Sequence, residues 1–455
     1  MLRDRKCDAI SKKDVGQKVR LAGWVHSVRD HGGILFIDLR DKYGITQVVF
    51  DNIDTPLKRE FVIQVEGDIR ERDSETYNPK IPTGEVELHA TNYKILGEAG
   101  MIPFEIDDSS IINDDTRLKY RFLDLRRPTM QNNLTLRHKA NLAARNYLDK
   151  IGFVEIETPY LVRSTPEGAR DYVVPSRVNI GSFYALPQSP QLYKQILMVS
   201  GADRYFQFAR CFRDEDLRAD RQPEHTQLDL EMSFAEQEDV FDVMEGIISS
   251  IAPVFNKKIK TPFKRLSYDE AMQHYGTDKP DLRYGLKIQD VSDIVKDSEF
   301  SVFNSVLSSG GSVKMLNPEF ILGRNEFDSY IDFVQSIGEK GMAWMIRDGS
   351  LDSNIVKYFP KDVQDKLLKI SKKGSLLFIA DKENKALEIA GKLRQKIAVE
   401  KNMIDENLFE FAWVTDFPLF SFNEDTERYE PEHHMFTMPK SDTLRYLEKD
   451  SYDPS

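Results

Sequence analysis

The sequence predicts an α+β protein of two or three domains, with a small β-barrel first and an inserted α+β domain late in the chain. Its 455 residues exceed what one hydrophobic core usually spans. Forty per cent of the residues are apolar and 11% are aromatic, which suffices for such cores and excludes a disordered chain. Short strand-like segments dominate up to about residue 95. From about residue 264 a Gly/Ser-rich patch, lysine-rich runs and a strand–helix pair at 375–397 mark the insertion.

Charge and cysteine content narrow the class of protein. The formal charge of −12 argues against a uniformly basic nucleic-acid binder, although the first thirty residues carry eight Lys or Arg against four Asp. Two cysteines, Cys7 and Cys211, are too few for a disulfide framework or a zinc ribbon. No stretch is apolar enough to span a bilayer, and the charged N-terminus lacks a signal-peptide core. We therefore expect a cytoplasmic enzyme or binding protein without zinc, a prosthetic group or a membrane partner.

Five strand segments predict the N-terminal barrel. Gly, Asp and Asn turns separate them, and they cover residues 18–28, 34–41, 45–50, 61–70 and 84–96. In ILFIDLR the expected core face holds Leu35, Ile37 and Leu39. The opposite face places Phe36 beside the charged Asp38 and Arg40, as in a base-stacking platform. Packing of Phe36 beneath a neighbouring loop explains the same pattern equally well.

A helix and a strand are predicted after a polar connector. The helix covers residues 131–152 and ends at Gly152. Its apolar positions are Leu134, Leu142, Tyr147, Leu148 and Ile151. The segment FVEIETPYLV then predicts a strand over 153–162, with Pro159 near its end, where proline favours an edge.

A second helix is predicted over SPQLYKQILMVSG, residues 189–201. Ser189 is its expected N-cap, Pro190 its first helical residue and Gly201 its end. Its apolar stripe is expected to be Leu192, Ile196 and Val199. Gln191 and Lys194, three residues apart, share another face. Such a pair on a helix is usually just solvated.

The segment CFRDEDLRADRQPEHTQLDLEMSF, residues 211–234, places polar and apolar groups on opposite strand faces. The polar face holds Gln227, Asp229, Glu231 and Ser233, and the apolar face holds Leu228, Leu230, Met232 and Phe234. The preceding strand is expected to carry Arg213 and Glu215 on the face of Gln207 and Ala209. A surface salt-bridge ladder explains the charges but not their confinement to one face, so a polar binding site is favoured.

In these segments the sequence resembles the bacterial-type aspartyl-tRNA synthetases, which are class II aminoacyl-tRNA synthetases. LAGWVHSVRDHGGILFIDLRDKYGITQVVF resembles their anticodon-binding OB-fold, GFVEIETPYL their motif 1, and FRDEDLRADRQPEHTQLDLEMSF their motif 2. STPEGARDY and QSPQLYKQ resemble their amino-acid-binding segments. The resemblance implies an OB-fold domain at 1–105, a hinge at 106–130, and a class II antiparallel-sheet catalytic domain at 131–263. It further implies a bacterial-type insertion at 264–408 and a resumed catalytic domain at 409–455.

The implied activity is ATP-dependent ligation of L-aspartate to tRNA through an aspartyl-adenylate. The tRNA partner is tRNA(Asp), either alone or together with tRNA(Asn), and motif 1 implies a homodimer. Attack of a carboxylate on the α-phosphate of ATP builds negative charge, which fixed cations stabilise. By resemblance the catalytic residues are Arg213 and Glu215, and ATP, as its Mg2+ complex, is bound by Arg213, Asp214, Glu215, Gln222, His225 and Gln227.

The resemblance also implies an aspartate subsite and an anticodon subsite. Aspartate is expected to contact Glu167, Gln191, Lys194, Arg213, Asp229 and His433. Selection against asparagine needs a buried cation, for which Lys194 is the candidate, because an amide would leave that cation underpaired. The pair His433–His434 has no metal-ligand spacing, so His433 is assigned to aspartate and not to zinc. The anticodon is expected to contact Arg29, His31, Phe36 and Gln47.

Three departures from the family pattern qualify the expected activity. His225 stands where the family has a phenylalanine that stacks on adenine, which predicts weakened ATP binding, and Met435 replaces a proline. Family members also continue past Ser455 through acidic Mg2+ ligands and motif 3, so we expect an incomplete synthetase with little aminoacylation. The alternatives are a non-catalytic tRNA-binding paralogue and an asparagine- or lysine-specific synthetase. The insertion and QSPQLYKQ argue against the latter two specificities.

Overall fold

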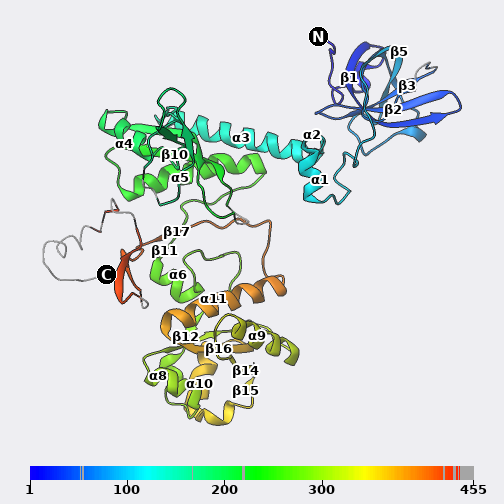
Figure 1. The fold of residues 1–455 in the computed structure, drawn as a ribbon. Coiled ribbons are helices and arrows are strands. Elements are labelled where there is room, and N and C mark those ends of the chain that lie inside the picture. The colour runs from blue at the N-terminus through cyan, green and yellow to red at the C-terminus, as the bar shows by residue number, and fades with distance from the viewer. Residues whose placement is uncertain are drawn as a thin grey trace. The chain divides into compact units, whose positions relative to one another are not determined.

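The computed structural model describes residues 1–51, 53, 56–165, 168–217, 221–423, 426–433, 437–438 and 440. The chain forms two compact units (Figure 1). The first unit comprises residues 1–236 and 246–257, and the second comprises 237–245 and 258–455. Each unit contains its own clusters of buried hydrophobic residues.

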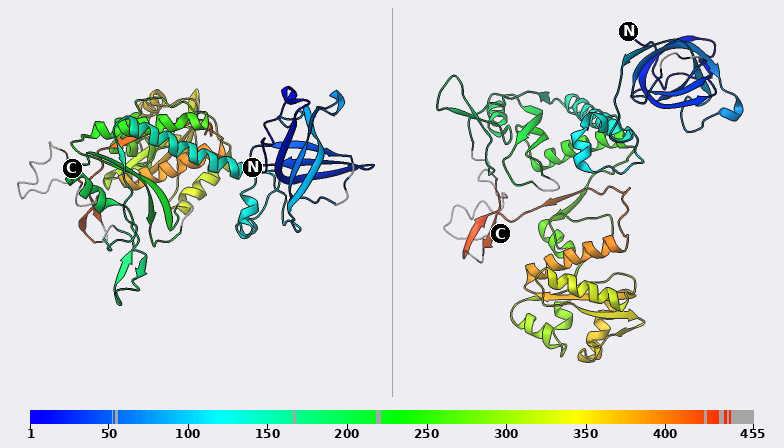
Figure 2. Two further views of the ribbon diagram at one scale, coloured as in Figure 1. Left: turned by 90° about the horizontal axis from the view of Figure 1, so that it is seen from above. Right: turned by 45° about the vertical axis from the view of Figure 1, so that its right-hand side comes forward.

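The first unit begins with a closed five-stranded barrel in the order β1-β2-β3-β5-β4 (Figure 2, right). Its strands are β1 (Lys18–His31), β2 (Ile34–Arg40), β3 (Ile45–Phe50), β4 (Val62–Glu71) and β5 (Val86–Gly97). Two 3-10 turns accompany them, η1 (Lys12–Asp14) and η2 (Ser74–Thr76). All neighbouring strands are antiparallel except β3 and β5. The five predicted strands and the barrel are thus confirmed.

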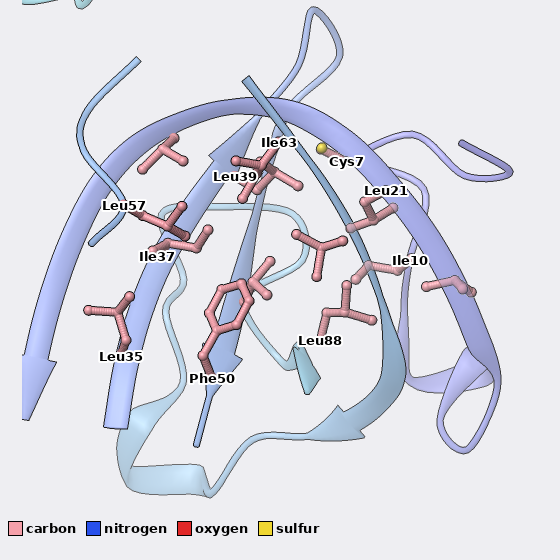
Figure 3. Packing of buried hydrophobic residues seen from close by; sticks show 14 of the residues in the cluster. Cys7, Ile10, Leu21, Leu35, Ile37, Leu39, Phe50, Leu57, Ile63 and Leu88 are labelled. Atoms are coloured by element: carbon pink, nitrogen blue, oxygen red, sulfur yellow. The ribbon is translucent and has the colours of Figure 1, made fainter. Parts of the chain in front are cut away.

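Alternating side chains fill the barrel interior (Figure 3). Leu35, Ile37 and Leu39 of β2 point inward with exposures of 9%, 0% and 0%, as predicted from their alternation. Cys7 joins this core from the segment before β1, and burial raises the pKa of its thiol. The thiol is therefore a packing group, because a buried neutral thiol is a poor nucleophile.

The outer face of β2 is not uniformly exposed, which corrects one expectation. Arg40 was placed with Phe36 on an open face, yet it is 7% exposed. Its guanidinium donates to both carboxylate oxygens of Glu60, at 2.7 and 3.0 Å. Arg126 donates to the same carboxylate at 2.9 Å and lies over the Trp24 ring. The buried Glu60 therefore requires both arginines as counter-charges.

Three helices follow the barrel: α1 (Asp114–Lys119), α2 (Arg121–Asp124) and the long α3 (Pro128–Lys150). Pro128 occupies the first turn of α3, where a missing N–H costs nothing. Gly152 follows the helix with a φ of +86°, confirming it as the end residue. The predicted apolar face of α3 is only partly buried, because Leu148 is 0% exposed whereas Leu134 and Leu142 are 51% and 46% exposed.

The strand predicted over 153–162 is wrong in extent. Only β6 (Val154–Glu155) forms there, and it runs parallel to the N-terminal end of β9. Pro159 therefore lies in irregular chain and not on a sheet edge. A short hairpin follows, made of β7 (Val173–Pro175) and β8 (Phe183–Ala185).

The predicted second helix exists as α4 (Gln191–Val199), but its orientation differs from expectation. Pro190, and not Ser189, is the N-cap. The stripe expected to be buried faces outward, since Leu192, Ile196 and Val199 are 49%, 51% and 91% exposed. Lys194, on the other side of the helix, reaches the sheet, and Leu197 and Met198 on that side are half-buried.

A small sheet in the order β10-β9-β6 completes the fold of the first unit. β9 (Arg204–Phe212) and β10 (Glu224–Met232) pair antiparallel along their full lengths. The helix α5 (Gln237–Ile251), part of which belongs to each unit, packs on α3 where Gly246 meets Tyr147, and η3 (Ala252–Phe255) extends it. A β-carbon at position 246 would lie 1.8 Å from the Tyr147 hydroxyl, so this contact requires glycine.

The second unit is built on a five-stranded sheet in the order β12-β13-β16-β14-β15. Its strands are β12 (Gln289–Asp290), β13 (Ser312–Leu316), β14 (Ala343–Asp348), β15 (Ser350–Asp352) and β16 (Gly374–Asp381). The surrounding helices are α6 (Tyr268–Tyr275), α7 (Ser292–Val295), α8 (Ser301–Ser308), α9 (Arg324–Ser336), η4 (Val356–Tyr358), α10 (Lys361–Ile370) and α11 (Glu383–Glu400). One hydrophobic cluster includes residues of α9 and α11, and a second cluster includes residues of α8 and α10. The strand–helix pair predicted at 375–397 corresponds to β16 and α11.

The two chain segments that flank this sheet pair with each other. β11 (Lys264–Ser267) and β17 (Ala412–Thr415) form a parallel pair. β18 (Phe420–Asn423) and β19 (Arg428–Pro431) then form a hairpin. In the part of the chain that the structure describes, no helix has the length and apolar character needed to cross a bilayer.

Candidate active site

Strands β9 and β10 form a floor whose polar side chains share one face. Asp229 lies opposite Gln207, and Gln227 lies opposite Ala209, so these side chains project from the same side of the sheet. Asp229 is 3% exposed. Leu228 and Leu230, on the other face of the same strand, are only half-buried. The predicted face of polar groups is therefore present. The strand β9 ends at Phe212, so Arg213 and Glu215 both lie in the loop that follows, and the expected strand alternation does not reach them.

Lys194 of α4 reaches this floor. Its ammonium lies 2.8 Å from the Asp229 carboxylate and 3.4 Å from Glu231. The Lys194 side chain is 13% exposed, and the Asp229 side chain is 2% exposed. The second carboxylate oxygen of Asp229 is buried and accepts no hydrogen bond among the described atoms. A buried acceptor without a partner is costly, so this oxygen suits a cationic or donor group of a ligand.

A layer of uncharged groups supports the floor. The Gln207 Oε1 atom accepts from the Thr158 hydroxyl at 2.8 Å and from the Tyr205 hydroxyl at 2.9 Å. Burial and then the nearby Asp229 raise the pKa of Tyr205, which keeps its hydroxyl protonated and able to donate. These bonds fix the Gln207 side chain directly opposite Asp229.

An open pocket of about 550 Å³ lies at the far end of the two strands. Its lining includes the predicted Arg213, Glu215, Gln222 and His225. Six residues absent from the predicted site also line it: Arg137, Arg210, Asp216, Arg221, Glu224 and Thr226. The Nε atom of Arg213 is buried and has no partner in the described part of the chain. Four arginines around one pocket favour an anionic ligand such as a polyphosphate.

The loop segments around this pocket are held by hydrogen bonds to the backbone. Gln188, which is 2% exposed, bonds Ala169 N–H and C=O at 3.1 and 2.9 Å. Asp214 N–H donates to the Arg170 carbonyl at 3.0 Å, and Arg213 N–H donates to the Pro223 carbonyl at 2.9 Å. These bonds join residues 169–170 to the segment that carries Arg213.

Several predicted positions lie elsewhere. Glu167, His434 and Met435 lie outside the described residues. His433 belongs to the second unit, where its ring meets Phe417 edge to face at 6.0 Å. Asp214 and Gln227 are not among the residues that line the 550 Å³ pocket, and Gln227 instead accepts from the Cys211 thiol at 3.3 Å.

Sequence reasoning missed residues that only the fold brings to the site. Arg210 lies on β9, and its position at the pocket follows from its register with Thr226. Arg137 comes from α3, more than seventy residues away in sequence, and no local pattern distinguishes it from other helical arginines. The strand alternation alone could have found Gln207, which lies on the predicted polar face.

Comparison with known proteins places this arrangement in a family. Residues 113–453 match the model for class II tRNA synthetases (D, K and N), and residues 19–96 match an OB-fold nucleic-acid-binding domain. The chain belongs to the class II tRNA synthetases. It is 48% identical to the aspartate–tRNA(Asp/Asn) ligase of Caldanaerobacter subterraneus subsp. tengcongensis, with 98% of the chain and 78% of the relative covered. It is 49% identical to that of Halothermothrix orenii, with coverages of 96% and 77%.

The fold agrees with that of a solved class II synthetase. Asparaginyl-tRNA synthetase from Pyrococcus horikoshii, complexed with asparaginyl-adenylate, superimposes with a TM-score of 0.54 at 20% identity. The match covers 87% of the chain and 96% of that structure. The expected α+β architecture, with an OB-fold before a class II synthetase domain, is thereby confirmed.

The four residues predicted to contact the anticodon lie on β1, β2 and β3 of the OB-fold in the present chain. The His31 and Phe36 rings meet edge to face at 5.6 Å, with His31 exposed and Phe36 half-buried. Arg29 donates to Asp38 at 2.9 Å and to Gln47 at 3.2 Å. Gln47 is 6% exposed and donates to Glu87 at 2.8 Å. Phe36 and His31 are therefore accessible to a base. Gln47 would have to give up its hydrogen bonds to Arg29 and Glu87 before it could bond a base.

Proposed function

We propose that this class II synthetase joins L-aspartate to tRNA in two steps. The aspartate α-carboxylate attacks the α-phosphorus of ATP, pyrophosphate leaves, and aspartyl-adenylate forms. A ribose hydroxyl at the tRNA 3′ end then attacks the acyl carbon and releases AMP. The observation that carries the proposal is the Lys194–Asp229 pair at 2.8 Å on a polar floor that leads to an arginine-lined pocket. The names of the relatives, aspartate–tRNA(Asp/Asn) ligases, support it.

The arginine-lined pocket is suited to the charge that develops during the first step. Attack at phosphorus spreads negative charge over phosphate oxygens, and fixed cations stabilise it. Arg213 stands where the floor meets the pocket, and its buried Nε has no partner among the described residues. We assign Arg213 to the α-phosphate and the aspartate carboxylate, and Glu215, Gln222 and His225 to the nucleotide.

The opposite end of the floor is suited to the amino acid. The Asp229 oxygen that has no partner among the described residues and the nearby Glu231 present negative charge to an ammonium group, while Lys194 presents positive charge to a side-chain carboxylate. Asparagine would give the lysine no counter-charge, and an underpaired buried cation is unfavourable. Gln191, one helical turn from Lys194, is assigned to the same subsite.

The residues suited to the phosphates of ATP and those suited to its Mg2+ are separate questions. The pocket of about 550 Å³ and its four arginines fit the phosphates. Among the described residues, no group of three or more His, Cys, Asp or Glu side chains could hold a metal ion. Mg2+, when bound with ATP, would neutralise phosphate charge, and the steps above use the side chains of this chain alone.

Aspartate-dependent exchange of labelled pyrophosphate into ATP tests the first step. We expect exchange with aspartate and at least about 100-fold less with asparagine or lysine, because only aspartate pairs with Lys194. An Arg213→Ala variant should lose exchange, whereas Arg428→Ala, on the exposed β19 strand, should keep it. Equal exchange with asparagine would overturn the specificity. Absence of exchange accompanied by tRNA binding would favour a non-catalytic tRNA-binding protein.

We further propose that tRNA(Asp) and tRNA(Asn) are both accepted, in line with the relatives' names, and that the reaction takes place in the cytoplasm. Phe36 is expected to stack on an anticodon base, beside His31. Charging of both purified tRNAs at rates within about tenfold would support this, because the discriminating energy would then be below about 1.4 kcal/mol. A preference for tRNA(Asp) above about 100-fold would contradict it.

A homodimer through motif 1 completes the proposal. Large apolar side chains are exposed around α3 and β6: Leu134 (51%), Leu142 (46%), Val154 (55%) and Leu161 (53%). Such residues are typical of an interface that a second copy covers. Light scattering should give a dimer for the unchanged protein and a monomer for Leu142→Asp. Leu118→Asp, at an exposed position on α1, is the matched control and should remain a dimer.

A further inference from the structure

One buried polar side chain of the first unit lies beside the candidate site and does not line its pocket. Gln188 stands in the short connection between β8 and α4, three residues before the first residue of the helix that carries Lys194. It is 2% exposed. Glutamine is rarely buried to this extent, because its amide loses water and needs protein partners in exchange. The partners of Gln188 therefore indicate why this position is polar.

The Gln188 amide bonds the backbone of one residue at two points. Its Oε1 atom accepts from the Ala169 N–H at 3.1 Å, and its Nε2 atom donates to the Ala169 carbonyl at 2.9 Å. Nε2 also donates to the Asp171 carboxylate, whose other oxygen accepts from the Ser164 hydroxyl. A carboxylate of the same size would turn lone pairs toward the Ala169 carbonyl and Asp171. The partners at this position therefore require an amide.

The segment held in this way is also bonded to the loop that carries Arg213. The Arg170 carbonyl accepts from the Asp214 N–H at 3.0 Å. The connection before α4 bonds the end of β9 directly as well, because the Pro187 carbonyl accepts from the Phe212 N–H at 2.9 Å. A single hydrogen bond leaves two segments free to rotate about it, whereas two separate connections fix their orientation. The buried amide thus supplies the second connection between the start of α4 and this loop.

The two elements joined here belong to the two halves of the candidate site. α4 carries Lys194 at the amino-acid end of the floor, and the loop after β9 carries Arg213 at the arginine pocket. Formation of an acyl-adenylate requires the two substrates to meet at one phosphorus atom, and a misplacement of about 1 Å can lower a rate about 100-fold. The relative placement of α4 and this loop therefore matters to the reaction.

We propose that Gln188 is a positioning residue, which holds the amino-acid subsite and the nucleotide subsite in fixed relative positions through Ala169 and Asp171. The inference rests on the proposed function, because it requires aspartate at Lys194 and ATP at the arginine pocket. A purely structural role predicts a different result. Loss of the amide would then weaken all ligands alike, whereas loss of positioning affects a ligand that must occupy both subsites at once.

Isothermal titration calorimetry with three ligands tests the proposal. The ligands are ATP, aspartate, and the sulfamoyl analogue of aspartyl-adenylate, which spans both subsites. Gln188→Glu should weaken binding of the analogue at least about 30-fold, because the carboxylate repels the Ala169 carbonyl and Asp171. The dissociation constants of ATP alone and of aspartate alone should change less than about threefold. Gln335→Glu, at an exposed glutamine of α9 that donates to a backbone carbonyl, is the matched control and should change none of the three.

Two further variants separate positioning from misfolding. Asp171→Ala, at a half-buried position, removes one of the three bonds of the amide and should weaken the analogue by about tenfold. In the double variant Gln188→Glu/Asp171→Asn, the amide introduced at 171 can donate to the carboxylate introduced at 188 and still accept from Ser164. At least about tenfold of the lost affinity for the analogue should therefore return. Circular dichroism shows whether each variant is folded.

The outcomes distinguish this inference from the proposed function. Equal binding of the analogue by Gln188→Glu and the unchanged protein would overturn the positioning role alone. Parallel weakening of all three ligands, or a double variant no better than Gln188→Glu, would also overturn it and leave a structural role. Failure of the unchanged protein to bind the analogue would overturn the proposed function, and the positioning role with it.

Discussion

At the scale of single residues, Lys194 is the group on which amino-acid selection depends. Lys194→Gln should raise the KM for aspartate by about 100-fold, because the substrate loses its cation and Asp229 loses its partner. The KM for ATP should change less than about threefold, since Lys194 does not line the arginine pocket. Pyrophosphate exchange at varied aspartate and varied ATP measures both constants. Lys372→Gln, in an exposed pair with Glu319, is the control that should leave both unchanged. An unchanged aspartate KM would exclude the assigned role.

Glu339 should also affect stability in a pH-dependent manner. Its pKa is raised in the folded state, so its contribution to stability is fully present below the unfolded pKa and is lost as pH rises through the folded value. The groups around it are Asp381 on β16, Lys385 on α11 and the adjacent Lys340. Glu339→Gln should therefore stabilise the protein at pH 7 but not at pH 4, by about 1.4 kcal/mol for each unit of elevation. Urea unfolding at the two pH values measures this. A difference that does not depend on pH would contradict it.

At the scale of elements, local sequence patterns predicted which helices and strands form, but not always which face of an element is buried. The barrel strands follow from alternation over a few residues, and Leu35, Ile37 and Leu39 are buried as that pattern requires. In α4 the apolar stripe faces outward, because Lys194 pairs with Asp229, 35 residues away. The sheet offers a carboxylate to that helix, and a local hydrophobic pattern contains no information about such a distant partner. The site residues Arg137 and Thr158 were missed for the same reason.

The contact between α3 and α5 gives a prediction at this scale. Alanine normally stabilises a helix by about 1 kcal/mol relative to glycine. At Gly246 the added carbon would lie 1.8 Å from the Tyr147 hydroxyl, so Gly246→Ala should instead destabilise by about 1–3 kcal/mol. Chemical denaturation measures the loss. Gly100→Ala, whose added carbon would have no atom within 4 Å, is the matched control and should change little. A more stable Gly246→Ala protein would show that α3 and α5 can move apart at this contact.

At the scale of the molecule, the composition change near residue 264 indicated an insertion, but not how its ends meet. The structure brings them together in the parallel pair of β11 and β17, with Lys264 opposite Ala412 and Ser267 opposite Thr415. Phe263 and Phe411 stack just before this pair, at 5.0 Å between ring centroids. The intervening sheet has hydrophobic clusters of its own on its two faces. Its fold therefore depends on contacts made within residues 268–410 more than on the strands that flank it.

This arrangement predicts that the insertion can be replaced by a linker. Parallel neighbours need a crossover and not a hairpin, so Ser267 should be joined to Phe411 through about twelve Gly and Ser residues. If the floor and arginine pocket are built by the first unit, aspartate-dependent exchange should persist within about tenfold of the full chain. Exchange assays on the shortened chain measure this result, and circular dichroism shows whether the shortened chain is folded. A folded chain without exchange would mean that the insertion contributes directly to catalysis.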